Sequence, residues 1–99
     1  MDPRCAPAAF HLVIEGRPDA AVLNQERFFL RLGKRIRQLR EEHGHSQEDM
    51  IYYGFSARHW QQIEAGRPIT VSTLLRICAV FETPIDRLVR GLDRGVYED

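Results

Sequence analysis

Apolar residues recur with helical spacing along the middle of this chain, starting shortly after residue 24. Asn24 suits the cap that begins a helix, and Gly44 suits its end. The apolar residues between them, spaced three or four positions apart, are Phe28, Phe29, Leu32, Ile36 and Leu39. Because one helical turn takes about 3.6 residues, this spacing predicts an amphipathic helix whose arginines lie on the solvated face.

Two short helices are expected next. Ser46 stands three residues before the acidic Asp49, in a near capping box that opens the first of them. Gly54 breaks this pattern, and Ser56 can cap the following helix, which runs to Glu64. The inward-facing residues of that helix are Trp60 and Ile63.

Two further helices complete the pattern. Thr70 opens a fourth helix, in which the apolar residues are Val71, Leu74, Leu75, Cys78 and Phe81. Residues 83–86 (TPID) predict the start of a fifth helix, with a cap, a proline at the first helical position and an acid in the first turn. Gly91 or Gly95 closes it. Five helices with short connections predict an all-α domain.

The first residues do not share this periodicity. We divide the chain into an N-terminal extended arm (1–23), a helical domain (24–92) and a C-terminal tail (93–99). Only residues 9–15 could form a short β-strand, and an isolated strand needs a partner. The alternatives are pairing with a second copy of itself in a dimer and disorder in the isolated chain.

Charge constrains the class of partner. The chain has 14 basic and 14 acidic side chains, so no global positive field attracts nucleic acid. Residues 25–91 nevertheless hold eleven Lys and Arg against eight Asp and Glu, whereas both flanks are acidic. A mildly basic centre suits a selective DNA binder better than a bulk one, because non-specific affinity scales with the number of phosphates neutralised.

Other features of the sequence exclude several protein classes. Cys5 and Cys78 are too few and too poorly placed for a secreted disulfide framework, and Cys78 is expected to be a small buried hydrophobic residue. No apolar run approaches membrane-spanning length, and the first residues lack a signal-peptide pattern, which favours a cytoplasmic protein. No catalytic spacing is recognisable, so neither an enzyme nor a cofactor is expected.

The third helix, residues 56–64, separates bulky inward residues from polar outward ones. In a helix-turn-helix, one short helix braces against the DNA backbone and the next lies in the major groove. Arginine binds the two acceptors of guanine, and glutamine pairs with adenine. We expect Arg58 and Gln62, one turn apart, to be the main readers of double-stranded DNA. The residues left facing outward or sideways are Ala57, Arg58, His59, Gln61 and Gln62.

Four runs of sequence together resemble the phage-repressor, Cro or Xre type of helix-turn-helix regulator. They are residues 32–40 (LGKRIRQLR), 46–50 (SQEDM), 63–67 (IEAGR) and 73–77 (TLLRI). The resemblance covers about residues 28–92, and the combined spacing is highly specific although each run alone is weak. It implies a five-helix, lambda-repressor-like helix-turn-helix domain that regulates transcription, as a repressor does.

The resemblance also implies roles for single residues. It implies an ion pair between Arg40 and Glu64, with a phosphate contact by Arg40 as an added role, and a DNA contact by Gln47. Residues near Arg67 and Thr70 would touch phosphates. The full set of candidate DNA-contacting residues is Arg40, Gln47, Ser56, Ala57, Arg58, His59, Gln61, Gln62, Arg67 and Thr70.

The sequence departs from the family pattern in two stretches, the lesser of which, from Gly66 to Thr73, is one residue short and alters only a loop. From Ser46 to Gly54 it is one residue shorter than usual, and Ile51 stands where the family has a small residue. We therefore expect the helix packing there to differ and the reading helix to be rotated or tilted.

A homodimer follows from the proposed mode of binding. One reading helix contacts few base pairs, so such domains generally bind as symmetric dimers on half-sites about one DNA turn apart. We expect the last helix to supply the interface, and the residues expected there are Leu88, Val89 and Leu92.

Several of these residues have a structural interpretation beside the functional one. Trp60 is expected to anchor its helix in the core rather than stack on a base. The histidines His11, His43, His45 and His59 lack the spacing of a metal site, so no metal is expected. A protein-interaction module stays open as a function, because the charge is near neutral. In an antitoxin-type variant, residues 1–23 would wrap a protein partner and order on binding.

Overall fold

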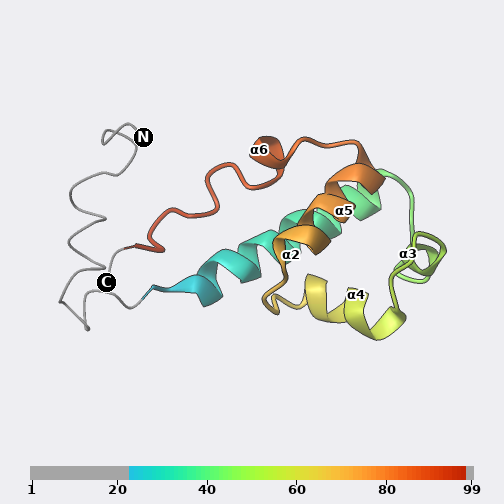
Figure 1. Cartoon of the computed structure of the whole chain (residues 1–99), viewed down its shortest axis with the longest axis horizontal. Coiled ribbons are helices and arrows are strands. Elements are labelled where there is room, and N and C mark those ends of the chain that lie inside the picture. Colours follow the sequence, from blue (N-terminus) through green and yellow to red (C-terminus); the bar gives the residue numbers. More distant parts are fainter. Residues whose placement is uncertain (1–22, 98–99) are drawn as a thin grey trace.

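The structure, a computed structural model, describes residues 23–97, and these residues form five α-helices and no strand. The helices, labelled as in Figure 1, are α2 (Gln25–Glu42), α3 (Asp49–Tyr52), α4 (Ala57–Glu64), α5 (Val71–Phe81) and α6 (Ile85–Leu88). The all-α prediction is confirmed. The strand predicted at residues 9–15 lies outside the described residues.

Three helices begin where the sequence predicts, because each has a polar cap. The side-chain oxygens of Asn24, Ser56 and Thr70 accept hydrogen bonds from the backbone N–H three residues further on, at 3.3, 3.0 and 3.1 Å. Each bond satisfies a donor that the first turn of a helix leaves free. Local sequence therefore sets the start of α2, α4 and α5.

The other two helices have four residues each, which agrees with the short helix expected for α3 but is shorter than expected for α6. Ser46 and Asp49 form the expected reciprocal capping contact, at 3.1 and 2.7 Å, at the start of α3. Pro84 has an extended ψ of 151° and precedes α6 rather than occupying its first position, which corrects the prediction. Helix α6 ends at Leu88, before Gly91 or Gly95, because the chain turns from there on.

The core lies between α2, α4 and α5. Trp60 is completely buried at its centre, with its ring 5.0 Å from that of Phe55 and 6.3 Å from that of Phe81. The other buried residues of α2 to α5 include Leu32, Ile36, Met50, Ile63, Leu74 and Ile77. Burial of such side chains is the main stabilising contribution in a domain of this size.

The backbones of α2 and α4 approach each other closely at Gly33. A Cβ atom on that residue would lie 2.6 Å from the carbonyl oxygen of Glu64 and 2.8 Å from that of Ile63. Only glycine fits this contact, so Gly33 sets the distance between α2 and the last turn of α4.

A C-terminal segment, residues 89–97, follows α6 and runs back along α2 (Figure 1). Arg31 Nη1 donates to the carbonyl oxygens of Leu92 and Arg94 at 3.0 and 2.6 Å. Arg35 Nη1 donates to those of Leu88 and Arg90 at 3.1 and 2.7 Å. The expectation that the arginines of this helix are solvated is therefore wrong for these two.

The segment also adds apolar residues to the core. Leu92 and Val96 are buried, and the carbonyl oxygen of Val96 accepts from the backbone N–H of Asn24 at 3.0 Å. Packing therefore continues past residue 92, into the range that the sequence indicated as a tail.

Candidate functional site

Helix α4 carries the residues that the sequence predicted to face a ligand. Trp60 and Ile63 are buried and hold the helix against the core. Because none of the Trp60 side chain is exposed, it cannot stack on a base in this conformation, and its role as an anchor is confirmed.

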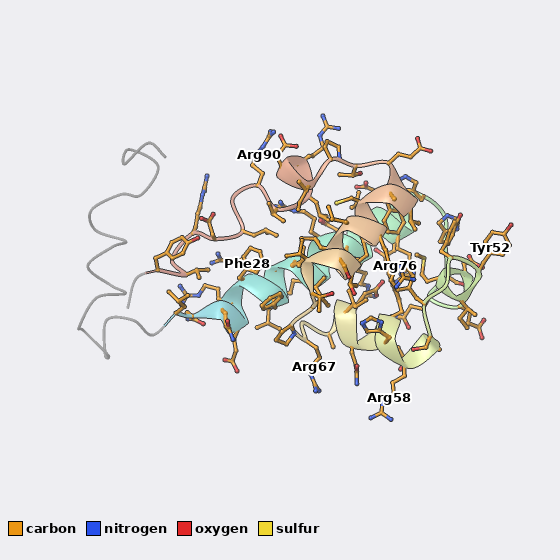
Figure 2. The ribbon with its side chains drawn as sticks, in the orientation of Figure 1. Phe28, Tyr52, Arg58, Arg67, Arg76 and Arg90 are labelled. Carbon is orange, nitrogen blue, oxygen red and sulfur yellow. The ribbon has the colours of Figure 1, made fainter. Side chains whose placement is uncertain are left out.

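The opposite side of α4 is open to solvent. Ala57, Arg58 and Gln61 are exposed, whereas His59 and Gln62 are half-buried. Gln61 is thus more exposed than Gln62, although the sequence favoured Gln62 as a base reader. In Figure 2 the side chain of Arg58 points away from the core, toward the same side of the molecule as Arg67.

Glu64, the last residue of α4, accepts four hydrogen bonds from three side chains. Arg40 donates from Nε to Oε2 at 2.6 Å and from Nη2 to Oε1 at 3.1 Å. Gln47 Nε2 donates to Oε1 at 2.9 Å, and Trp60 Nε1 donates to Oε2 at 2.6 Å. The side chains of Arg40 and Glu64 are only 9% and 5% exposed, so this is a buried and fully satisfied network.

The environment of Glu64 sets its protonation. Burial alone would raise the pKa of its carboxyl group, but the hydrogen bonds from Arg40, Gln47 and Trp60, with the charge of Arg40, lower the pKa overall. The hydrogen bond to Glu64 likewise raises the pKa of Arg40. Both groups are therefore charged at neutral pH, and the pair ties α2 to the end of α4.

Gln47 lies at the junction of α2, α3 and α4. Its amide nitrogen is used by Glu64, and the side chain is half-buried. An amide has two N–H groups and one carbonyl oxygen, so the side chain keeps further hydrogen-bonding capacity for a ligand. The hydrogen bond to Glu64 thus holds Gln47 at the end of α4.

The candidates for phosphate contact lie just after α4. Arg67 is exposed, and its backbone N–H donates to the carbonyl oxygen of Gln62 at 3.0 Å. Thr70 is also exposed, and its hydroxyl caps α5 and donates to the hydroxyl of Thr73 at 3.1 Å. Both residues therefore lie at the surface next to α4.

Two of the residues predicted at a dimer interface are in the core. Leu88 and Leu92 are 1% and 3% exposed, while Val89 is half-buried. The helical pattern of this region packs against α2 of the same chain, so Leu88 and Leu92 are not available to a second copy. On α6, the apolar side chain that remains exposed is Ile85, at 39%.

Arg76 helps to hold the turn between α3 and α4 in place, a role that the sequence did not indicate. Its guanidinium carbon lies 4.3 Å from the centre of the Phe55 ring, and Nη2 donates to the carbonyl oxygen of Gly54 at 3.1 Å. These contacts tie α5 to the turn between α3 and α4. Gly54 has a positive φ of 94°, a conformation that favours glycine, and the sequence indicated this residue only as the break between two helices.

Residues 23–97 contain neither a metal-binding cluster nor a membrane-spanning helix. That range holds no group of three His, Cys, Asp or Glu side chains placed to bind a metal ion. None of its helices combines the length and the hydropathy needed to cross a bilayer. Cys78 is half-buried, and burial raises the pKa of its thiol; Cys5 and His11 lie outside the described residues.

Comparison with known proteins agrees with this geometry. Residues 31–91 match the family of helix-turn-helix domains. Over 87 residues, or 85% of the chain, the sequence is 31% identical to a protein of Pyrococcus horikoshii assigned, provisionally, as an HTH-type transcriptional regulatory protein. The chain covers 27% of the length of that relative. No solved structure matches the chain. The chain belongs to the family of helix-turn-helix domain proteins.

Proposed function

We propose that this protein is a sequence-specific, DNA-binding transcriptional regulator of the phage-repressor, Cro or Xre type, with α4 in the major groove. The observation that carries the proposal is the division of α4: Trp60 and Ile63 are buried, while Arg58 and Gln61 are exposed. Helix α3 precedes it at the short spacing of a helix-turn-helix. The name of the Pyrococcus relative supports the same role.

Base reading is assigned to the exposed face of α4. Arg58 is the expected reader of guanine, because its fork of donors matches two acceptors in the major groove. Gln61 and Gln62 are the candidates for adenine, and the greater exposure of Gln61 favours it. Arg67 and the start of α5 at Thr70 are the proposed phosphate contacts. Arg40, which the resemblance gave the same added role, is not one of them, because its guanidinium is buried and donates to Glu64 and to the carbonyl oxygen of His45.

Replacing Arg58 with Ala is expected to weaken binding at one base position, by roughly 1–3 kcal/mol. The measurement is a competition assay between the operator and single-base variants of it. Arg67→Ala is the matched control, because removal of a phosphate-binding side chain weakens binding to all sequences alike. A uniform effect of Arg58→Ala on all sequences would instead assign Arg58 to the DNA backbone.

We further propose that the functional unit is a homodimer, since one α4 contacts too few base pairs for useful specificity. Because Leu88 and Leu92 are buried within the chain, the proposed dimer interface is the outer face of α6, at Ile85 and Val89. Ile85→Asp is expected to leave the melting temperature nearly unchanged and to weaken dimerisation. Sedimentation at micromolar concentration measures this, and a variant that stays as dimeric as the parent places the interface elsewhere.

The test of the whole proposal is selection of bound sequences from a random DNA pool at two salt concentrations. An inverted-repeat motif with half-sites about ten base pairs apart is expected. Recovery of no motif, with binding that disappears as salt rises, would favour the alternative function. That alternative is a protein-interaction module or an antitoxin-type partner binder, and the zero net charge of the chain is the observation in its favour.

A further inference from the structure

A cationic groove, distinct from the exposed face of α4, follows the outer side of α2. Two shallow depressions adjoin along this helix and share Arg31 and Lys34 in their walls. The cationic residues that line the two depressions are Arg27, Arg31, Lys34, Arg35 and Arg37, and we call this surface the α2 groove. Its carboxylates are Glu26 and Glu41.

Most of the positive charge in the α2 groove has no acidic partner. Glu41 is paired with Arg37, at 3.2 Å. Within residues 23–97, no carboxylate lies within salt-bridge distance of Arg31, Lys34 or Arg35. The chain as a whole is neutral, so a local excess of positive charge on one helix face marks a surface suited to an anion.

Two of the guanidinium groups are held in place before any ligand arrives. Arg31 and Arg35, one helical turn apart, are half-buried, and each uses only Nη1 to bind two backbone carbonyls. A guanidinium has five N–H donors, so Nε and Nη2 remain for an anion. Because these side chains are already ordered, binding costs less conformational entropy than at free surface arginines.

The shape of the groove indicates a linear polyanion rather than a single small ion. Residues 27–38 of a helix span about 16 Å, at about 1.5 Å per residue. Phosphates along one strand of DNA follow each other closely over such a length, and a guanidinium matches a phosphate in geometry. The backbone of a nucleic acid therefore fits the groove better than an isolated phosphate.

The groove begins beside the end of α4, where Leu30 lies against Gly66, and extends away from α4 along the wall that Arg35 forms. Arg35 binds the carbonyl oxygen of Arg90, and Figure 2 shows Arg90 on the side of the molecule opposite to Arg58 and Arg67. We propose that the α2 groove binds the phosphate backbone of a second DNA duplex, so that the protein bridges two DNA segments. This goes beyond operator reading by α4 but rests on the proposed function, because α4 holds the first duplex.

The test compares two charge reversals in the full chain, Lys34→Glu in the groove and Arg87→Glu outside it. Both residues are exposed, and both changes alter the charge equally. Equal melting temperatures establish that both variants fold. One duplex is immobilised, and capture of a second, labelled duplex by the protein is measured together with the salt dependence of binding to non-specific DNA.

Wild type and Arg87→Glu are expected to capture the second duplex, and Lys34→Glu is expected to lose capture. The slope of log affinity against log salt should fall by about 1 for each phosphate that the Lys34→Glu variant no longer neutralises. The motif that Lys34→Glu selects from a random pool should be unchanged, which separates a failure of bridging from a failure of operator reading.

Three results would overturn the inference. The first is absence of capture by the wild-type protein, and the second is capture by Lys34→Glu equal to wild type. If Lys34→Glu captures the second duplex as well as wild type does but Arg58→Ala does not, the two copies of α4 in a dimer form the bridge. The third is displacement of the second duplex by polyglutamate as readily as by DNA, which would make an acidic polypeptide the ligand of the groove.

Discussion

The Glu64→Ala variant is expected to unfold more easily than the wild type, by about 3–5 kcal/mol in the free energy of unfolding. The change removes the acceptor of four hydrogen bonds and leaves the buried guanidinium of Arg40 without its counter-charge. Urea denaturation followed by circular dichroism measures this difference. The total free energy of unfolding of a natural domain is only about 5–15 kcal/mol, so the expected loss is a large fraction of it.

A matched control lies in an exposed ion pair on α2, the helix that carries Arg40. Arg37 and Glu41 are 3.2 Å apart, with side chains 63% and 54% exposed, so Glu41→Ala should cost less than about 1 kcal/mol. Equal effects of the two substitutions would contradict the view that the network of Glu64 holds α4 in place.

Glu64 also makes the stability of the protein depend on pH. The pKa of Glu64 is lowered in the folded protein from an ordinary value of 4.5, so its contribution to stability is complete above that value. The contribution is lost as the pH falls through the lowered pKa of the folded state. Glu64→Gln should therefore show a weaker loss of stability between neutral and acidic pH than the wild type.

Gly33→Ala is expected to destabilise the protein, although the same change usually stabilises a helix by about 0.5–1 kcal/mol. The added Cβ would lie 2.6 and 2.8 Å from the backbone oxygens of Glu64 and Ile63, which cannot rotate away as a side chain can. Overpacking of this kind costs roughly 1–3 kcal/mol. Because the contact lies in the last turn of α4, operator affinity should fall as well.

Thermal denaturation of Gly33→Ala beside Gln38→Ala separates the clash from a change in helix propensity. Gln38 is exposed on the same helix, so its replacement should change stability by no more than about 0.5 kcal/mol. If Gly33→Ala melts at or above the wild-type temperature with operator affinity intact, α2 and α4 can move apart at no cost, and the predicted clash is contradicted.

Local chemistry made part of this fold predictable. The starts of α2, α4 and α5 follow from caps that act over three residues, and the burial of Trp60 follows from helical spacing. The pair of Arg40 and Glu64 lies where the family resemblance implied it, at 2.6 Å. The indole of Trp60 as a further donor to Glu64 was not foreseen, because an apolar anchor does not reveal which way its N–H points.

The rest depends on contacts between distant parts of the chain. Arg31 and Arg35 bind backbone carbonyls more than fifty residues away, and carbonyls carry no signature in the sequence. Leu88, Val89 and Leu92 were expected at an interface between two copies, because periodicity does not say whether the partner of an apolar face is the same chain or a second copy. For Leu88 and Leu92 it is the same chain.

The hydrogen bond between Asn24 and Val96 has a practical consequence for engineering. It holds the two ends of the described fold together, at the end of the molecule away from α3 (Figure 1). Folds with adjacent ends tolerate insertion into a surface loop of another protein, because the host chain need not stretch to accommodate them. Residues 23–97 could thus be spliced as one unit into a host protein, with the exposed face of α4 still accessible to a ligand.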